Sequence, residues 1–433
     1  MSGWLTTLRR LWREHRWAAL GLIGALVLIV GGAVGIAYDK FKRPPDIHNE
    51  GVAFHPQKPK VQKRKTVSWP LYGYDRSRTR YLPVKGVKPP FKRVWRYTER
   101  PLLEFPPVVA GGKLYFVDNS GHAIALDADN GKQLWKRRIG RLNASSPSYY
   151  KHRLYIVNLV PGHVIKLDAK TGRIIWKRSL PGRAESSPVV VDRTIYFGCE
   201  DGSLYALSTR NGNVRWSTGL GGPVKSAPAY YGGVLYVGDY GGYMNAVDAK
   251  NGKLIWQSDS LGQGFGTSGA FYSTPAVAFG RVYAGNNDTR VYSFDRRDGT
   301  IAWTFSTGGY VYSGPAVART SHTGPTVYIG SFDGNVYALN AKSGEPRWIR
   351  SAGGSVIGSL TAVGDIVYAA EFGSTSTTGY AMKGGRTVFR YPRGTYTPVV
   401  SDGHRLYLVG YSSITALQPY KYKTAIADRR VAR

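Results

Sequence analysis

The sequence is poor in the residues that support redox or metal chemistry. Its one cysteine, Cys199, excludes an internal disulfide framework, and its place beside Gly198 in an apolar run favours a small buried residue over a reactive thiol. The eight histidines show neither an HExxH motif nor paired metal-ligand spacing. Phosphate-binding Walker loops and nucleophile elbows are missing as well. We therefore expect no catalytic residue, no cofactor-binding residue and no metal ligand.

Acidic residues are also scarce. The chain has 27 Asp and Glu against 59 Lys and Arg, and this net charge of +32 predicts an acidic surface or polymer as a neighbour. The basic residues are dispersed through turns and chain ends, without a nucleic-acid-binding module. We therefore expect no nucleic-acid partner, and we expect anionic lipid or cell-wall polymer as candidate neighbours.

Long hydrophobic runs are nearly absent, with one exception near the N-terminus. Residues 17–38 carry no charge and are long enough to cross a hydrocarbon core of about 30 Å as a helix. We interpret them as an uncleaved transmembrane signal-anchor, preceded by a short basic cytoplasmic segment, residues 1–16. Cleavage after Ala37 is the alternative. The prediction is a single-pass protein of the cell membrane whose bulk lies on the extracytoplasmic side.

The segments that flank the main body are basic and lack β pattern. Residues 39–68 contain prolines and a run of lysines, which predicts an extended, solvated linker. The linker either binds anionic headgroups or is a spacer without a target. Residues 421–433 are predicted to be a disordered basic tail.

Between these segments, residues 69–420 repeat one pattern. Residues 188–216 show it most clearly, as four short runs of β-branched and aromatic residues separated by Asp-Gly and Asn-Gly turns. A tryptophan closes most units, at intervals of about forty residues: Trp95, Trp135, Trp176, Trp216, Trp256, Trp303 and Trp348. Phe389 occupies the next equivalent position. A four-stranded unit of this period is typical of a propeller blade.

A second marker gives the number of blades. One tyrosine follows an aliphatic residue in every unit, at Tyr115, Tyr155, Tyr196, Tyr236, Tyr283, Tyr328, Tyr368 and Tyr407. The last unit supplies three strands, whereas Trp95 stands on a strand with no unit before it. We expect the Trp95 strand to complete the last blade. The predicted fold is all-β, an eight-bladed β-propeller of four-stranded antiparallel blades preceded by one transmembrane helix.

Three stretches interrupt the repeat: residues 258–272, 319–325 and 371–378. Added loops on a repeat scaffold are candidate recognition surfaces. They are equally consistent with slack connections that have no function.

The third and fourth strands of each unit resemble the tryptophan-docking motif Ala-x-Asp-x-x-x-Gly-x-x-x-Trp of pyrroloquinoline-quinone-type propellers. The motif is complete at Ala125, Asp127, Gly131 and Trp135, and it recurs with substitutions in most other units. The resemblance implies that the seven tryptophans have a structural role and fill the seams between blades. It also implies that the glycine permits the hairpin turn and that the aspartate bonds turn backbone.

Two functional branches share this repeat. Quinoprotein dehydrogenases are similar in their blades and commonly have a vicinal cysteine pair, a calcium ion held by carboxylate and amide groups, and a catalytic aspartate. This chain has one cysteine and few carboxylates. BamB-type propellers are similar in length and blade number and bind partner protein without chemistry. They are anchored through an N-terminal cysteine, which this chain lacks.

The expected function is that of a membrane-anchored, non-catalytic protein-binding scaffold of the cell envelope, similar to BamB-type assembly factors, with an unidentified envelope protein as partner. One alternative is a quinone-dependent dehydrogenase. Another is a sensor that binds polysaccharide or peptide in the central channel, lined by inner-strand serines: Ser145, Ser187, Ser226, Ser273 and Ser313.

Overall fold

The computed structural model describes residues 43–56, 68–262 and 269–420. The described residues within 46–260 and 269–420 belong to the propeller unit, and residues 43–45 and 261–262 belong to a second unit without helix or strand in its described part. The expected transmembrane helix, residues 17–38, and the expected tail, residues 421–433, lie outside the described residues. Among the residues that are described, no helix is long and apolar enough to span a membrane.

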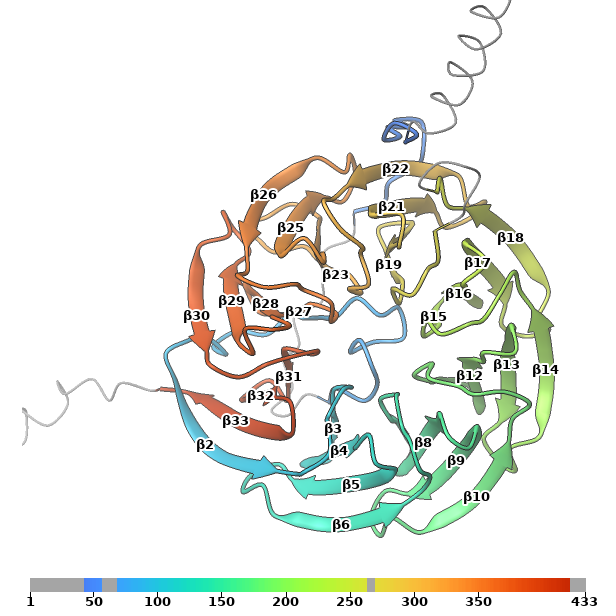
Figure 1. The fold of residues 1–433 in the computed structure, drawn as a ribbon, viewed down its shortest axis with the longest axis vertical. Coiled ribbons are helices and arrows are strands. Elements are labelled where there is room, and N and C mark those ends of the chain that lie inside the picture. The colour runs from blue at the N-terminus through green and yellow to red at the C-terminus, as the bar shows by residue number, and fades with distance from the viewer. Residues whose placement is uncertain (1–42, 57–67, 263–268, 421–433) are drawn as a thin grey trace, which may run out of the picture. The chain divides into compact units, whose positions relative to one another are not determined.

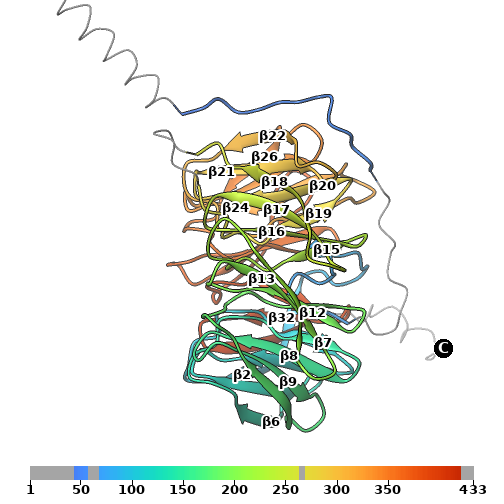
Figure 2. The same cartoon turned by 90° about the vertical axis from the view of Figure 1, so that its right-hand side faces the viewer.

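The propeller consists of eight antiparallel sheets arranged around a central axis (Figure 1), and Figure 2 shows the blades from the side. The prediction of an all-β eight-bladed propeller is confirmed. In blades 1 to 7 the four strands of the repeat are hydrogen-bonded in sequence order from the axis outward, as short hairpins between Val, Ile and Tyr-rich runs require.

The first four blades follow one another along the chain. Blade 1 contains β3 (Val108–Ala110), β4 (Lys113–Val117), β5 (His122–Asp127) and β6 (Gln133–Arg138). Blade 2 contains β7 (Ser148–Tyr150), β8 (Arg153–Asn158), β9 (His163–Asp168) and β10 (Ile174–Ser179). Blade 3 contains β11 (Val189–Val191), β12 (Thr194–Gly198), β13 (Ser203–Ser208) and β14 (Val214–Gly219). Blade 4 contains β15 (Ala229–Tyr231), β16 (Val234–Gly238), β17 (Tyr243–Asp248) and β18 (Leu254–Asp259).

Blades 5 to 7 repeat the pattern. Blade 5 contains β19 (Ala276–Ala278), β20 (Arg281–Gly285), β21 (Arg290–Asp295) and β22 (Ile301–Ser306). Blade 6 contains β23 (Ala316–Ala318), β24 (Thr326–Gly330), β25 (Asn335–Asn340) and β26 (Pro346–Ser351). Blade 7 contains β27 (Thr361–Val363), β28 (Ile366–Ala370), β29 (Thr377–Ala381) and β30 (Thr387–Tyr391). A fifth strand, β1 (Tyr81–Leu82), pairs in parallel with β27.

Blade 8 closes the ring with strands from both ends of the domain. It contains β31 (Val399–Ser401), β32 (Leu406–Val409) and β33 (Ser413–Pro419), and its outer strand is β2 (Phe91–Thr98). β2 pairs antiparallel with β33, with Trp95 opposite Ala416. The expected closure through the Trp95 strand is therefore confirmed, and blade 8 has its fourth strand.

Part of the predicted linker lies against the propeller. His48 forms a β-bridge with Trp303 on the outer strand of blade 5, and the Asn49 amide donates to the carbonyl of Ala302 at 2.7 Å. The carbonyl of Val52 accepts a 2.8 Å hydrogen bond from Arg281, which is fully buried. Residues 46–56 of the predicted linker thus contact blade 5, where their backbone groups satisfy polar groups of that blade.

The segment that precedes β1 lies inside the ring of inner strands (Figure 1), and we call residues 69–82 the plug segment. Trp69 forms a bridge with Val109 of blade 1. Carbonyls farther along the segment accept backbone hydrogen bonds from the inner strands of blades 2, 4, 5, 6 and 7: Pro70 from Tyr149, Arg76 from Tyr230, Ser77 from Val277, Thr79 from Val317 and Arg80 from Ala362. The plug segment thus satisfies inner-strand amides that face the channel.

Candidate functional site: the channel pocket

Two fully buried arginines of the plug segment fill the middle of the channel. The Arg78 guanidinium donates to the carbonyls of Tyr72, of Pro228 at 3.1 Å and of Ser187 at 2.9 Å. Burial, and then the charge of Arg80, lower the pKa of Arg78 to about 9. Arg80 donates to the carbonyl of Arg78 at 2.9 Å and to that of Pro315 at 3.2 Å. The channel therefore does not run open through the domain at this level.

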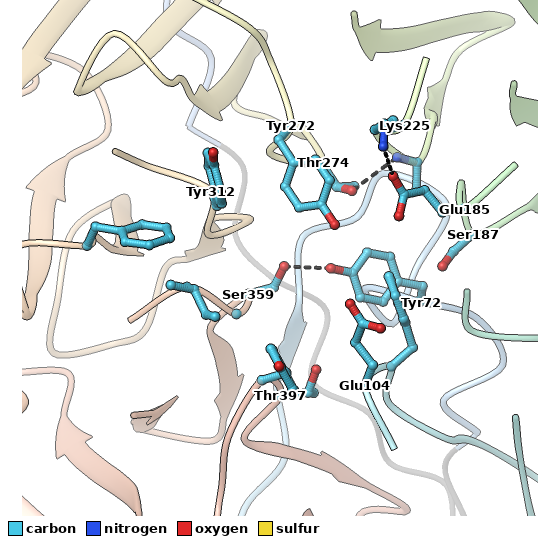
Figure 3. A pocket seen from close by; sticks show the side chains of 16 residues that line it. Tyr72, Glu104, Glu185, Ser187, Lys225, Tyr272, Thr274, Tyr312, Ser359 and Thr397 are labelled. Atoms are coloured by element: carbon cyan, nitrogen blue, oxygen red, sulfur yellow. Dashed lines mark hydrogen bonds and ion pairs between the residues drawn. The ribbon is translucent and has the colours of Figure 1, made fainter. Parts of the chain in front are cut away.

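Tyr72 separates these arginines from a pocket. The guanidinium carbons of Arg78 and Arg80 lie 5.7 and 5.0 Å from the centre of the Tyr72 ring. The Tyr72 hydroxyl is hydrogen-bonded to Ser359 Oγ at 2.6 Å. Tyr72 also lines a pocket of about 250 Å³ (Figure 3). Tyr72 is thus at once a cover for the buried arginines and a wall of the pocket.

The pocket lies on the face of the propeller where the outer strand of one blade connects to the inner strand of the next. These connections supply most of its wall: Glu104, Phe105, Glu185, Ser187, Lys225, Ala227, Tyr272, Thr274, Tyr312, Ile357, Gly358, Ser359, Tyr396 and Thr397. Phe332 comes from the turn between β24 and β25. Because each connection enters an inner strand, the propeller fold brings residues from almost every blade to one place.

Aromatic rings make up much of the lining. Tyr272 and Tyr312 lie 5.2 Å apart between ring centres, and Tyr312 lies 4.9 Å from Phe332 with the rings nearly perpendicular. Tyr240 and Tyr310, beside the pocket, continue this contact chain outward onto the surface. The result is a connected aromatic wall that extends from the pocket to its rim.

Two carboxylates and one ammonium group share the same space (Figure 3). Lys225 Nζ lies 2.7 Å from Glu185 Oε1. Glu104 has no ion pair within the described part of the chain, and it accepts a long hydrogen bond of 3.4 Å from the side-chain amide of Asn119. Burial, and then the charge of Glu185, raise the pKa of Glu104 above its ordinary value. Burial, and then the charges of Glu185 and Glu104, raise the pKa of Tyr272 well above its ordinary range. Both carboxylates therefore act on the Tyr272 hydroxyl.

The tryptophans that close the units lie at the seams between blades. Each indole Nε1 donates to a carbonyl of the next blade at 2.9–3.3 Å, from Trp95 to Ala128, Trp135 to Ala169, Trp176 to Thr209, Trp216 to Ala249, Trp256 to Arg296, Trp303 to Ala341 and Trp348 to Met382. The motif glycine of the next blade lies directly beneath the ring. A Cβ at Gly131 would lie 2.6 Å from Trp95 Cε3, so a side chain does not fit there.

The inner-strand serines do not form a ligand-binding ring, and that expectation is wrong. All five are buried, and only Ser187 lines the pocket described above. Their hydroxyls are committed to backbone: Ser226 Oγ donates to the carbonyl of Gly238 at 2.8 Å, and Ser273 Oγ to that of Ser313 in the next blade at 2.8 Å. Ser187 Oγ accepts from the amide of Ser146 in the preceding blade at 2.9 Å. These serines join strands and blades near the axis.

Other residues considered in the sequence have local roles. Cys199 is fully buried, and burial raises the pKa of its thiol to about 11. Asp127 accepts hydrogen bonds from the amides of Asp129 and Asn130, and Asp129 pairs with Arg405 at 2.7 Å. In the irregular stretch 371–378, the fully buried Glu371 accepts 2.6 Å hydrogen bonds from Ser374, Ser376 and Thr378. Its carboxylate therefore organises its own loop.

Sequence reasoning missed the residues of the channel pocket. Glu104 and Glu185 were a usable signal, because both lie in connections between blades whereas many of the other carboxylates serve the repeat turns. Arg78 and Arg80 stand two residues apart, and both have a left-handed backbone, with φ of 59° and 52°. Nothing in the local sequence pattern indicated that this segment is enclosed by eight inner strands.

Comparison with known proteins fits this architecture. A family model described as outer membrane protein assembly factor BamB matches residues 84–227 and 216–409. The chain belongs to this BamB family. A search of curated protein sequences found no match to the chain. The crystal structure of BamB from Moraxella catarrhalis is similar, with a TM-score of 0.64 and 17% identity over 77% of this chain and 98% of that one.

Quinoprotein structures have a similar fold. A quinohemoprotein alcohol dehydrogenase from Comamonas testosteroni gives a TM-score of 0.67 at 13% identity, over 81% of this chain and 80% of that one. A europium-containing methanol dehydrogenase gives 0.69 at 13% identity, over 82% and 91%. At such identities the likeness concerns the fold, and the site has to be judged on its own residues.

The residues of the channel pocket do not fit the quinone and calcium pair that the dehydrogenase resemblance implies. Calcium takes about six to eight oxygen ligands. Of the two pocket carboxylates, Glu185 is already paired with Lys225, and within the described residues no three His, Cys, Asp or Glu side chains are grouped as metal ligands. The volume of about 250 Å³ is also below the about 300–1,000 Å³ of drug-sized ligand sites. A polycarboxylate quinone would in addition face Glu104.

Proposed function

We propose that the chain is a non-catalytic protein-binding scaffold of the cell envelope that acts through the pocket face of its propeller, as BamB-family membership favours. The observation that carries this proposal is the distribution of exposed aromatic side chains. Within the described residues most of them lie on the pocket face: Tyr240, Tyr310, Phe332, Phe372 and Tyr411. Aromatic residues are enriched in protein interfaces and often act as anchors there.

The repeat itself does not require these aromatics. Tyr240, Phe332, Phe372 and Tyr411 occupy the turn between the second and third strands of blades 4, 6, 7 and 8, whereas blade 3 has Glu200 at the equivalent turn. A turn position of this kind is normally polar. Their clustering around one mouth is consistent with a surface that a partner protein covers.

The proposal places the propeller outside the cytoplasm, held at the membrane by residues 17–38. Its net charge of +32 would keep it near anionic lipid or cell-wall polymer, while the aromatic face selects an envelope protein. A quinone-dependent dehydrogenase is the competing function, supported by fold likeness to quinoproteins. The misfit of the pocket residues speaks against it.

Site-specific crosslinking in intact cells tests the scaffold proposal. A photo-reactive phenylalanine analogue would replace Tyr240, which is 37% exposed on the pocket face, or Tyr231, which is 38% exposed at the far end of the same blade. We expect a discrete protein adduct from position 240 and none from position 231. Equal labelling at both positions would argue against a specific face.

An activity assay addresses the competing function. The purified full-length protein would be incubated with pyrroloquinoline quinone, calcium and a redox dye, with simple alcohols and aldoses as substrates. We expect no substrate-dependent dye reduction. Turnover that requires the quinone would overturn the scaffold proposal.

A further inference from the structure

The channel pocket has the chemistry of a receptor for a cation. We propose that it binds a single lysine or arginine side chain of the partner protein, presented by an extended segment that lies on the aromatic rim. This inference rests on the scaffold function proposed above and names the group that the scaffold recognises. It is carried by the charge, the lining and the size of the pocket.

The first observation is the sign of the charge. In a chain with 59 basic and 27 acidic residues, the pocket is lined by two carboxylates and one ammonium group. Glu185 has Lys225 as its counter-ion, whereas Glu104 has none within the described residues. A half-buried carboxylate beside another carboxylate is unfavourable unless a cation approaches it. The group that best complements Glu104 is therefore positively charged.

The second observation is the aromatic wall. A cation within about 6 Å of an aromatic ring face is attracted by the ring quadrupole, and the attraction strengthens when water is excluded. The chain already uses this contact next to the pocket, with Arg80 over Tyr72 at 5.0 Å and Lys225 over Tyr240 at 5.4 Å. Tyr272, Tyr312 and Tyr396 also line the pocket and offer further rings to a ligand that enters it.

Lys225 shows how such a ligand would bind. Its ammonium group lies 2.7 Å from Glu185 Oε1 and 3.6 Å from Glu200 Oε1, and its charge lies over the Tyr240 ring, so acid, ring and cation already occur together here. Glu104 with its neighbouring rings repeats the acid and the rings and lacks the cation. A guest lysine at Glu104 would complete a second set of the same kind.

The third observation is size. The volume of about 250 Å³ is too small for a folded element and suits one long side chain that enters from the rim. An anionic guest fits less well, because Arg78 and Arg80 lie behind Tyr72 and do not line the pocket, whereas Glu104 and Glu185 do.

Peptide binding to the full-length protein tests the inference. Fluorescent peptides with one common uncharged backbone would carry lysine, arginine, norleucine or glutamate at the central position, and fluorescence anisotropy would measure their affinity at low salt. We expect the lysine and arginine peptides to bind at least tenfold more tightly than the norleucine peptide, and the glutamate peptide to bind weakest. Equal affinity for lysine and norleucine would overturn the inference.

Variants locate the site. We expect E104Q, which keeps the shape of the side chain, to weaken lysine-peptide binding about tenfold and to leave norleucine binding unchanged. E104K would place a cation in the pocket and abolish the preference for lysine. The control is E345Q, which removes an exposed carboxylate from the opposite face. A lysine preference that survives both Glu104 variants would refute the assignment.

The outcomes separate this inference from the proposed function. A specific crosslink at position 240 together with no lysine preference would reject the cation pocket and leave the scaffold standing. Quinone-dependent turnover would reject the scaffold whatever the peptides do.

Discussion

The indole nitrogen of Trp95 donates a 3.0 Å hydrogen bond to the carbonyl of Ala128, and this contact joins the last blade to the first. Trp95 belongs to β2, the outer strand of blade 8, and Ala128 to the hairpin that follows β5 in blade 1. The same contact recurs at six other seams. These seven contacts link neighbouring sheets around the ring, and Phe389 stands in the place of the tryptophan in blade 7.

The seam predicts an unequal effect of two similar substitutions. Gly131 has φ +73° and carries the Trp95 ring, whereas Gly112, in the same blade, has φ +72° and no atom within 4 Å of the place that a methyl group would take. Alanine at either site takes a left-handed backbone, which costs about 1–2 kcal/mol. We expect G131A to lose about 1–3 kcal/mol more, because the methyl group displaces the indole. Thermal and denaturant unfolding of both variants would measure the difference, and equal losses would show that the seam tolerates the methyl group.

The buried arginine of the plug segment predicts a second contrast. Arg78→Met leaves the three channel carbonyls that accept from Arg78 without these donors. Each buried carbonyl without a hydrogen bond costs about 1–3 kcal/mol of stability. Removal of the charge repulsion between Arg78 and Arg80 offsets part of this cost. We expect a net loss of about 2–4 kcal/mol in the free energy of unfolding. Arg76→Met changes an exposed residue of the same segment and serves as the matched control. Similar stability of the two variants would mean that the plug segment is dispensable for the fold.

Ring closure predicts the outcome of two truncations. Deletion of residues 421–433 leaves every described strand in place, and we expect resistance to limited proteolysis to be unchanged. A chain that ends at Arg405 loses β32 and β33, so β2 loses its partner and the ring opens. We expect rapid proteolysis of the propeller in this variant. A shortened chain that stayed resistant would show that seven blades can close without the eighth.

Burial of Cys199 predicts low thiol reactivity. Burial raises the pKa of the thiol from 9.0 to about 11, which lowers its thiolate fraction at neutral pH about 100-fold. We expect Ellman's reagent to react at least 100-fold more slowly with the native protein than with protein unfolded in guanidinium chloride. Comparable rates would mean that the strand around Cys199 opens readily.

The cation pocket predicts a pH dependence of peptide binding. The ionised form of Glu104 attracts the guest, and its pKa is raised above the ordinary 4.5, so protonation begins at a higher pH than for an exposed glutamate. We expect the affinity for the lysine peptide to fall as the pH decreases through this raised pKa. Glu185 also faces the pocket, so E104Q is the comparison that isolates Glu104. The same pH profile in wild type and E104Q would exclude Glu104 as the titrating group.

The propeller could be predicted from the sequence in detail because its information is local and repeated. Strand runs, Asp-Gly and Asn-Gly turns and the tryptophan spacing all lie within about forty residues, and the unpaired Trp95 strand indicated the closure. The sequence did not predict the contacts that lie outside the repeated hairpins. Residues 46–56 look like a solvated linker until blade 5 is beside them, and the inner-strand serines look like a channel lining until their acceptors in neighbouring strands are seen.

By itself the sequence determined the number of blades, the strand order within each blade and the residue that fills each seam, because each depends on contacts within one unit or between adjacent units. Only the tertiary structure decided what the channel contains. Tyr72, Glu104 and Glu185 are far apart along the chain and carry no motif, and they meet because eight connections converge on one axis that the plug segment enters. Convergence of this kind is a property of the closed ring, so no single repeat encodes it.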